Sequence, residues 1–391
     1  MVTAAGGGGD NSTSPLVGSA HAASCSIDES YKYIFLPLCY SFTFVFSISL
    51  NSVVLYRSFR RTKRWNASLI YMVNLASTDF MYGLSLPFLV ASYIMRDRWV
   101  FGDFMCRLVR FLFYFNLYCS IFFLTCISVH RYLGICHPMK TITLETKRAV
   151  KGTCVLVWAV VFVLTSPIFR FAQTGFVTRG VGGAPGGTVE AFQNCWDDAI
   201  DKEFSEYVPY GIILHLLGFF IPFIIIAWCY SHVVMTIIRT LRSQPQLQGG
   251  GNREGVSAAP GPMCAYVRRR RKSIKTIITI TLLFALCFFP FHVTRTLFLI
   301  LKSRGLPCPS MRTVSICYKV TRPLASFNAW LNALLYFFTK DKSAPCCPSP
   351  DPAHHGLLWP LKMLGKVGGA GEGGGGVNEK ENESKSSGNM F

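Results

Sequence analysis

Seven apolar blocks, each longer than twenty residues, limit the folds open to this sequence more than any other feature. A helix rises about 1.5 Å per residue, so about 20 apolar residues cross the roughly 30 Å hydrocarbon core of a bilayer. Only 15% of the 391 residues are charged, whereas a typical soluble protein has about 25%. The sequence therefore predicts an all-α, multi-pass membrane protein with a seven-transmembrane helix bundle. The predicted spans are Ile34–Tyr56, Ala67–Ile94, Phe104–Gly134, Ala149–Phe169, Tyr207–Ile237, Ile274–Leu301 and Thr313–Phe338.

Basic residues between the spans predict which way the chain crosses the membrane. The loops after the first, third and fifth spans, counted with Arg131 and Lys275 at the adjoining span ends, contain 18 Lys and Arg residues, and the segments on the opposite side contain 9. Cytoplasmic loops are the richer in Lys and Arg, so the N-terminus is predicted to be extracellular. The formal net charge of +19 could also indicate nucleic-acid binding. The placement of the charges favours the membrane explanation. We therefore expect the protein to contact membrane lipid and not to bind nucleic acid.

Composition divides the chain into three parts. They are a disordered extracellular N-terminus (1–30), the seven-transmembrane bundle (31–340) and a disordered cytoplasmic tail (341–391). Within the bundle, the long outer loop over residues 170–206 is rich in glycine. Such a segment has little to bury, so we expect this loop to be mobile.

Two short features outside the spans suggest modification. Asn11 begins an Asn-Ser-Thr tripeptide, which is a glycosylation acceptor on an extracellular segment. Cys346 and Cys347 follow the last span, where cysteines can be palmitoylated. Plain free thiols explain these two cysteines equally well.

The seventh span carries positive charge near its outer end. Lys319 and Arg322 are three residues apart and therefore share one helix face. An Arg within a bilayer costs about 2.5–3.5 kcal/mol by insertion scales, so it usually has a partner or a function. His292 and Arg295 repeat this spacing in the outer part of the sixth span, and Arg110 lies near the outer end of the third.

Each of these five side chains could reach water on its own by snorkelling. Together they place like charges at one level of three helices, where they repel one another and do not stabilise the fold. A polyphosphate would bridge them, because guanidinium groups bind phosphate oxygens through paired donors. The pattern therefore predicts a shared anion site. Phe113 and Tyr114 in the third span could stack on a base there, although aromatic residues at this spacing are more often plain core.

Polar residues also lie deep in several spans, where lipid cannot satisfy them. Asp79 is the most demanding, because an unpaired carboxylate at mid-bilayer is unfavourable. Amide and hydroxyl oxygens beside it suit a sodium ion, the one metal that the sequence suggests. A hydrogen-bonded packing cluster explains the same residues equally well, and both interpretations stay open. The set is Asn51, Asp79, Ser120, Asn328 and Asn332.

Motifs within the spans resemble those of rhodopsin-like G-protein-coupled receptors. L-A-S-T-D ends at Asp79, and His130-Arg131-Tyr132 stands where that class has D-R-Y. The stretch from Asn332 to Tyr336 stands where the class has N-P-x-x-Y.

Longer stretches are similar to the metabotropic purinergic (nucleotide) receptors. They are R-F-L-F-Y-F-N-L-Y-C-S from Arg110, F-P-F-H-V-T-R-T from Phe289 and Y-K-V-T-R-P-L-A-S from Tyr318. This resemblance implies a plasma-membrane receptor for an extracellular nucleotide, a purine or pyrimidine di- or triphosphate. It implies signalling through heterotrimeric G proteins, with phospholipase C and calcium as the expected route, and no cofactor. It also moves Tyr114 from plain core toward ligand contact.

Other classes of function remain as alternatives. The same basic cluster could serve a receptor for another small anion, such as a dicarboxylate or an acidic lipid mediator. An anion transporter could use it too, although it would need a continuous polar path. An enzyme is not expected, because the sequence offers no nucleophile–base pair or metal set.

The resemblance also assigns roles to particular residues. It implies one disulfide between Cys106 and Cys195 and another between Cys25 and Cys308, and it places Asp197 at the mouth of the ligand site. The residues implied in G-protein coupling are His130, Arg131, Tyr132, Tyr230 and Tyr336.

One pair departs from the resemblance. Asn332-Ala333 stands where the purinergic branch usually has Asp-Pro. Without the proline a kink is lost and a backbone donor returns, so the seventh helix is expected to be straighter there.

Overall fold

The computed structural model describes residues 30–63, 65–137, 146–181, 188–196, 204–242, 274–305 and 308–339. Helices cover all seven predicted spans within these ranges. The first four spans are α1 (Lys32–Arg61), α2 (Ala67–Ile94), α3 (Gly102–Cys136) and α5 (Lys147–Thr165), followed by the short α6 (Ile168–Phe171). The fifth consists of α7 (Phe204–His215), a π-helical turn (Leu216–Phe220) and α8 (Ile221–Arg242). The sixth runs through helical residues 274–283, a π-helical turn (Phe284–Phe288) and α10 (Phe289–Ser303), and the seventh is α11 (Cys308–Ser326) with α12 (Asn328–Thr339).

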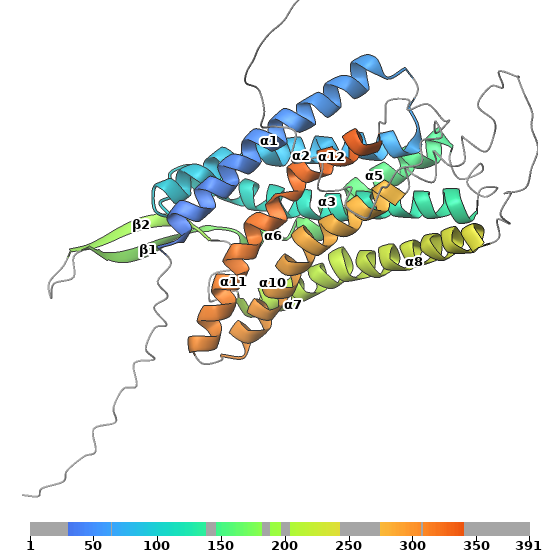
Figure 1. The fold of residues 1–391 in the computed structure, drawn as a ribbon. Coiled ribbons are helices and arrows are strands. Elements are labelled where there is room, and N and C mark those ends of the chain that lie inside the picture. The colour runs from blue at the N-terminus through green and yellow to red at the C-terminus, as the bar shows by residue number, and fades with distance from the viewer. Residues whose placement is uncertain are drawn as a thin grey trace, which may run out of the picture. The chain divides into compact units, whose positions relative to one another are not determined.

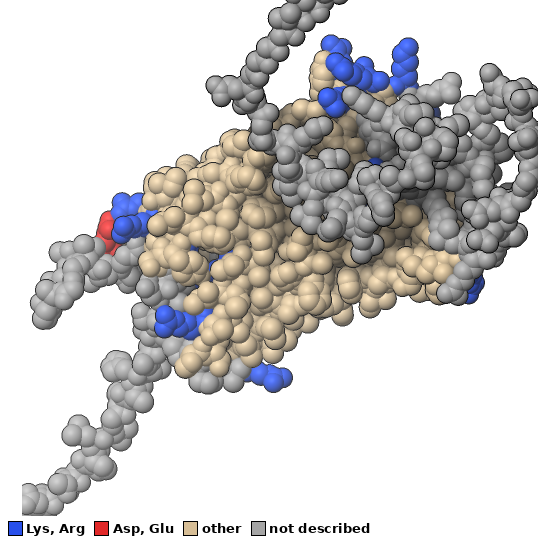
Figure 2. Space-filling view, viewed as in Figure 1, with Lys and Arg blue, Asp and Glu red and all other residues tan. Residues whose placement is uncertain are grey.

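Besides a hydrophobic core, the helices bury a series of polar residues and expose many large apolar ones. In α1 the buried face includes Thr43, Ser47 and Asn51, spaced four residues apart as on one helix face. Leu38 and Val45 are 66% and 56% exposed. On the face drawn in Figure 2, the described Lys and Arg side chains gather toward the two ends and leave an uncharged band between them. This surface fits a helix bundle that faces lipid.

Five of the described helical segments are long and apolar enough to cross a membrane by length and composition alone. They are Lys32–Arg61, Gly102–Cys136, Lys147–Phe171, Phe204–Arg239 and Ile274–Ser303. The remaining two spans, α2 and the α11–α12 pair, pack with these five in one bundle. In α2 the buried residues include Thr78, Asp79 and Ser85, so this helix turns polar groups toward its neighbours.

The outer loop contains a β-hairpin, which was not predicted from the sequence, and residues 182–187 of its glycine-rich part lie outside the described residues. β1 (Thr174–Val181) pairs with β2 (Thr188–Cys195) in an antiparallel register that runs from Thr174 opposite Cys195 to Val181 opposite Thr188. The hairpin is tied to the helices: Trp99 donates its backbone N–H to the Gln193 carbonyl at 2.8 Å. Strand pairing satisfies the backbone hydrogen bonds of this segment, and composition alone does not reveal such pairing. Figure 1 shows the hairpin at the end of the bundle where α1 and α11 begin.

The seventh span contains a break, but not beside Ala333. Pro323 lies inside α11, and the helix stops at Ser326. Phe327 donates its N–H to the carbonyls of Pro323 and Leu324, and α12 then begins at Asn328. α12 continues through Ala333 without interruption, as expected for a position that keeps its backbone N–H.

The direction of insertion is a prediction that labelling can test. An epitope tag before Ser14 should stain intact cells, because the charge count places the N-terminus outside. A tag after Gly376 should be detected only after permeabilisation. The opposite staining pattern would contradict the predicted orientation.

Candidate ligand site

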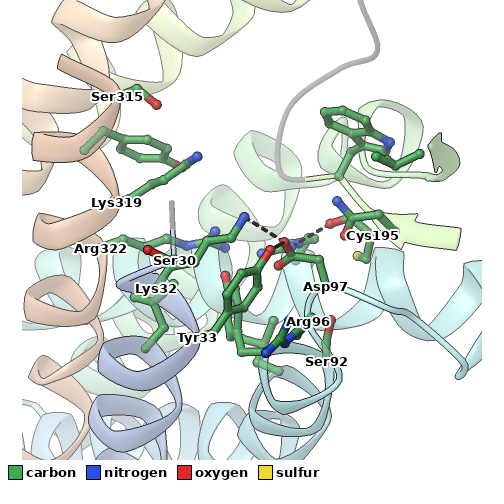
Figure 3. Close-up of a pocket in the computed structure, with 18 of the residues that line it drawn as sticks. Ser30, Lys32, Tyr33, Ser92, Arg96, Asp97, Cys195, Ser315, Lys319 and Arg322 are labelled. Carbon is green, nitrogen blue, oxygen red and sulfur yellow. Dashed lines mark hydrogen bonds and ion pairs between the residues drawn. The ribbon is translucent and has the colours of Figure 1, made fainter. Parts of the chain in front are cut away.

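A cavity of about 670 Å³ lies at the end of the bundle that carries the hairpin (Figure 3). Residues of α1, α2, α3, α10 and α11 form its wall together with both strands. Its volume is within the range of roughly 300–1,000 Å³ that is usual for small-molecule sites. The lining includes six basic residues: Lys32, Arg96, Arg110, Lys302, Lys319 and Arg322.

Arg110 and Arg322 are the most buried of these basic side chains. Arg110 is 6% exposed and donates from Nη2 to the carbonyl of Cys195 at 2.8 Å. Arg322 is 5% exposed, and its guanidinium carbon lies 5.0 Å from the centre of the Phe113 ring. Guanidinium groups bind phosphate oxygens through two N–H donors at once. This pair therefore suits a phosphate that reaches between α3 and α11.

The other four basic residues also line the cavity. The ammonium group of Lys302 lies 4.2 Å from the centre of the Phe204 ring, and Lys32 forms an ion pair with Asp97 at 2.7 Å. Of these four residues, only Lys319 was predicted as a site residue from the sequence. The other three stand at the ends of spans, where basic residues are common, and only their position on the predicted outer side points to the site.

Arg295 contacts the residues that line the cavity and does not itself line it. Its side chain is fully buried and donates from Nη2 to the Tyr207 hydroxyl at 2.8 Å. Its guanidinium carbon also lies 4.6 Å from the centre of the Tyr318 ring, and Tyr318 does line the cavity. Phe113 likewise contacts a lining residue, Arg322, and does not itself line the cavity. These residues support the cavity wall, and direct ligand contact by either stays a prediction.

His292 and Tyr114 lie among other buried side chains. The His292 ring stacks on Phe219 with centroids 4.1 Å apart and 9° between the planes. Tyr114 packs edge-on against Phe113 at 5.0 Å between centroids. Neither lines the cavity, so their roles in binding remain predictions, and Asp197 lies outside the described residues.

The disulfide between Cys106 and Cys195 is confirmed, with 5.6 Å between the two Cα atoms. It fastens the end of β2 to α3, one turn before Arg110. Because Arg110 bonds to the carbonyl of Cys195, the disulfide also fixes the acceptor that orients this guanidinium. Cys25 and the side chain of Cys308 lie outside the described residues, so the second pairing stays a prediction, as do the modifications at Asn11, Cys346 and Cys347.

Replacing Cys106 or Cys195 by Ser should lower surface expression and the response to ligand. A disulfide that closes a long loop contributes about 2–4 kcal/mol to stability. Cys317, an exposed free cysteine on α11, provides the control, and Cys317→Ser should behave like the parent. Flow cytometry of surface receptor measures the effect. Single and double replacements that match the parent would show that the disulfide does not matter for folding.

Apart from Asn51, the deep polar residues meet around the Asp79 carboxylate, which is fully buried. Oδ1 accepts from the Asn116 amide at 2.7 Å, and Oδ2 accepts from the Asn332 amide at 3.1 Å. Ser120 donates to Oδ1 at 3.5 Å and to Asn328 Oδ1 at 3.4 Å. The carboxylate, hydroxyl and amide oxygens here fit a sodium ion. The hydrogen bonds satisfy most of the cluster without an ion, but the buried Oδ1 of Asn332 has no hydrogen-bond partner among the described residues.

Asn51 has a separate role. Its amide donates to the carbonyl of Ala329 at 2.7 Å and to the carbonyl of Ser47 at 2.9 Å. It therefore ties α1 to α12 and does not contact the carboxylate of Asp79 in any hydrogen bond described here.

The residues predicted for G-protein coupling lie near the opposite end of α3. Tyr230 on α8 shares a 2.6 Å hydrogen bond with Ser128, and Arg131 donates to Ser68 on α2 at 3.2 Å. The Tyr132 hydroxyl lies 3.1 Å from Nε2 of His137. Tyr336 is buried and His130 is partly buried. These contacts join α3 to α2 and α8, and a role for these residues in G-protein coupling stays a prediction.

Comparison with known proteins agrees with this architecture. Residues 50–336 match the family "7 transmembrane receptor (rhodopsin family)". The chain is 39% identical to the Y-subtype purinoceptor 2 of Homo sapiens over 334 residues, which cover 83% of this chain and 81% of that protein. It is 38% identical to the Y-subtype purinoceptor 3 of Meleagris gallopavo over 323 residues (82% and 89%). It is also 38% identical to the Y-subtype purinoceptor 4 of Mus musculus over 318 residues (81% and 79%).

Proteins of this family are receptors and not enzymes, and they cross the plasma membrane several times. The seven-helix architecture, the buried Asp79 cluster and the disulfide from α3 to the hairpin are all in place here. The chain therefore belongs to the rhodopsin family of seven-transmembrane receptors, in the group that contains the Y-subtype purinoceptors.

Proposed function

We propose that this receptor is activated by an extracellular nucleoside di- or triphosphate that binds in the cavity beside the hairpin. The charge of the cavity carries this proposal. Among its described lining residues, six are basic and Asp97 is the one acidic residue. A ligand that stabilises such a surface must bring several negative charges close together, as a polyphosphate chain does.

The rest of the lining suits the remainder of a nucleotide. Tyr33, Tyr93, Phe192 and Trp196 supply aromatic faces on which a base could stack. Ser92, Ser315 and Asn194 supply hydroxyl and amide groups that could bind a ribose or base edge. The names of the purinoceptor relatives support the same ligand class.

Signalling through a heterotrimeric G protein, with phospholipase C and calcium as the route, belongs to the same proposal. Ligand contacts at α3 and α11 would bias the bundle toward a state in which the inner ends of its helices separate. A sodium ion at Asp79 would favour one of the two states, and it is the only metal that this proposal includes.

The test is a response panel in cells that have no nucleotide response of their own. Cells that express the full-length receptor receive nucleoside mono-, di- and triphosphates, dicarboxylates and acidic lipids, with calcium and cyclic AMP as readouts. We expect a calcium response to nucleotides that disappears with apyrase, and none in mock-transfected cells. A response to dicarboxylates or lipids in the presence of apyrase, with none to nucleotides, would favour the alternative anion receptor. Uptake of labelled nucleotide into vesicles without signalling would favour a transporter.

A further inference from the structure

Asp97 is an anion in the wall of a cavity whose other charged lining residues are cations. Its Oδ2 forms the 2.7 Å ion pair with Lys32 and accepts a hydrogen bond from the Tyr33 hydroxyl at 2.8 Å. Figure 3 shows these three side chains side by side, with Lys319 and Arg322 on the facing helix. The Lys32 and Asp97 side chains are only 13% and 12% exposed. The pair is therefore much better shielded from water than an ordinary surface ion pair, such as Arg170 with Glu206 at 65% and 60%.

The backbone around Asp97 is held in an unusual conformation. Arg96 and Asp97 have φ angles of 56° and 70°, in the left-handed region that residues with a side chain rarely adopt. Backbone bonds fix this turn: Arg96 donates to the Tyr93 carbonyl at 3.1 Å, and Asp97 donates to the Ser92 carbonyl at 2.9 Å. Arg96 and Asp97 both line the cavity. Backbone strain of this kind tends to occur where function needs a particular placement.

We propose that Asp97 is a specificity-determining residue that sets how many phosphates the ligand must carry. Asp97 neutralises Lys32 on the wall that faces Arg322 across the cavity (Figure 3). A single phosphate held by the buried Arg110 and Arg322 does not need Lys32. A longer phosphate chain reaches Lys32 and competes with Asp97 for its ammonium group, because both are anions that accept from the same donors.

Asp97 therefore lowers the affinity for highly charged nucleotides and keeps it from rising steeply with each added phosphate. The ion pair also joins the start of α1 to the turn between α2 and α3, so a ligand that breaks it would weaken this connection and leave the Tyr33 hydrogen bond to Asp97. This inference deepens the proposed function and rests on it, since it concerns discrimination among nucleotides at the same cavity.

The experiment compares the potencies of nucleoside mono-, di- and triphosphates at the parent receptor and at Asp97→Asn. The variant keeps an acceptor for Tyr33 but loses the charge that holds Lys32. We expect the potency ratio of triphosphate to monophosphate to rise by about tenfold, the lower end of the contribution of one hydrogen bond to a charged group. Lys32→Gln should lower the same ratio, and Lys32→Arg should restore most of it.

Two controls separate specificity from folding. Glu206→Gln removes the exposed ion pair with Arg170 outside the cavity lining and should leave the ratio unchanged. Surface expression is measured for every variant, because a merely structural tie between α1 and the α2–α3 turn would lower expression and shift all nucleotides equally. That uniform shift, or an unchanged ratio in Asp97→Asn, would overturn this inference and leave the nucleotide receptor intact. A parent receptor that responds to no nucleotide would overturn both.

Discussion

Arg322→Gln should weaken agonist potency by about 10- to 150-fold while surface expression stays near that of the parent. Arg322 is buried in the cavity wall, above the Phe113 ring on α3. A hydrogen bond to a charged group contributes about 1.5–3 kcal/mol, and about 1.4 kcal/mol corresponds to a tenfold change in affinity. The measurement is a concentration–response curve with surface receptor quantified in the same cells.

Two further variants sharpen this test. Arg322→Lys keeps the charge but loses the planar pair of donors, so it should recover only part of the response. Arg312→Gln removes an exposed arginine from the same helix that does not line the cavity, and it should leave potency unchanged. An Arg322→Gln receptor with normal potency, or with low expression and an unshifted curve, would remove Arg322 from the site.

Arg295→Gln should act mainly on stability. The Arg295 guanidinium is fully buried, bonds to the Tyr207 hydroxyl and lies over the rings of Tyr318 and Phe298. Loss of one charged hydrogen bond and of the cation–π contacts should reduce the free energy of unfolding by about 2–4 kcal/mol. The melting temperature of purified receptor should fall, and so should surface expression.

The contrast between the two arginines separates a residue that supports the cavity wall from a residue that contacts the ligand. Arg295→Lys keeps the charge near Tyr318 and should recover part of the lost stability. Agonist potency, measured on the receptor that reaches the surface, should change less at Arg295→Gln than at Arg322→Gln. An Arg295→Gln receptor with an unchanged melting temperature and a large loss of potency would show that Arg295 contacts the ligand directly.

The helices were predictable because their signal is local. The predicted second span, Ala67–Ile94, coincides with α2, since a long apolar block has few alternatives in a membrane. The fourth span was predicted as one helix to Phe169, but α5 ends at Thr165 and the chain turns at Pro167 before α6. The hairpin was missed because its stability comes from pairing between segments, which composition does not reveal.

The site was predictable only in part. A helical pattern shows on which face of the helix a residue lies, but not how deeply its side chain is buried. Arg295 and Arg322 each lie three residues after another cationic or titratable group, yet Arg322 lines the cavity and Arg295 packs against Tyr207. The contact between Lys32 and Asp97 joins two segments far apart in the sequence, and no local pattern points to it. Such pairs depend on how α1 packs against α2, which only the three-dimensional structure gives.

Equilibrium binding of a labelled nucleoside triphosphate to the purified full-length receptor tests the central claim most directly. We predict saturable binding that weakens as the salt concentration is raised. Among the described charged residues that line the cavity, all except Asp97 are cations, and salt screens their attraction for the ligand. Unlabelled nucleoside triphosphate should displace the label, dicarboxylates should not, and Arg322→Gln should weaken the binding. Label that does not bind saturably, or that a dicarboxylate displaces as well as a nucleotide does, would contradict a polyphosphate site in this cavity.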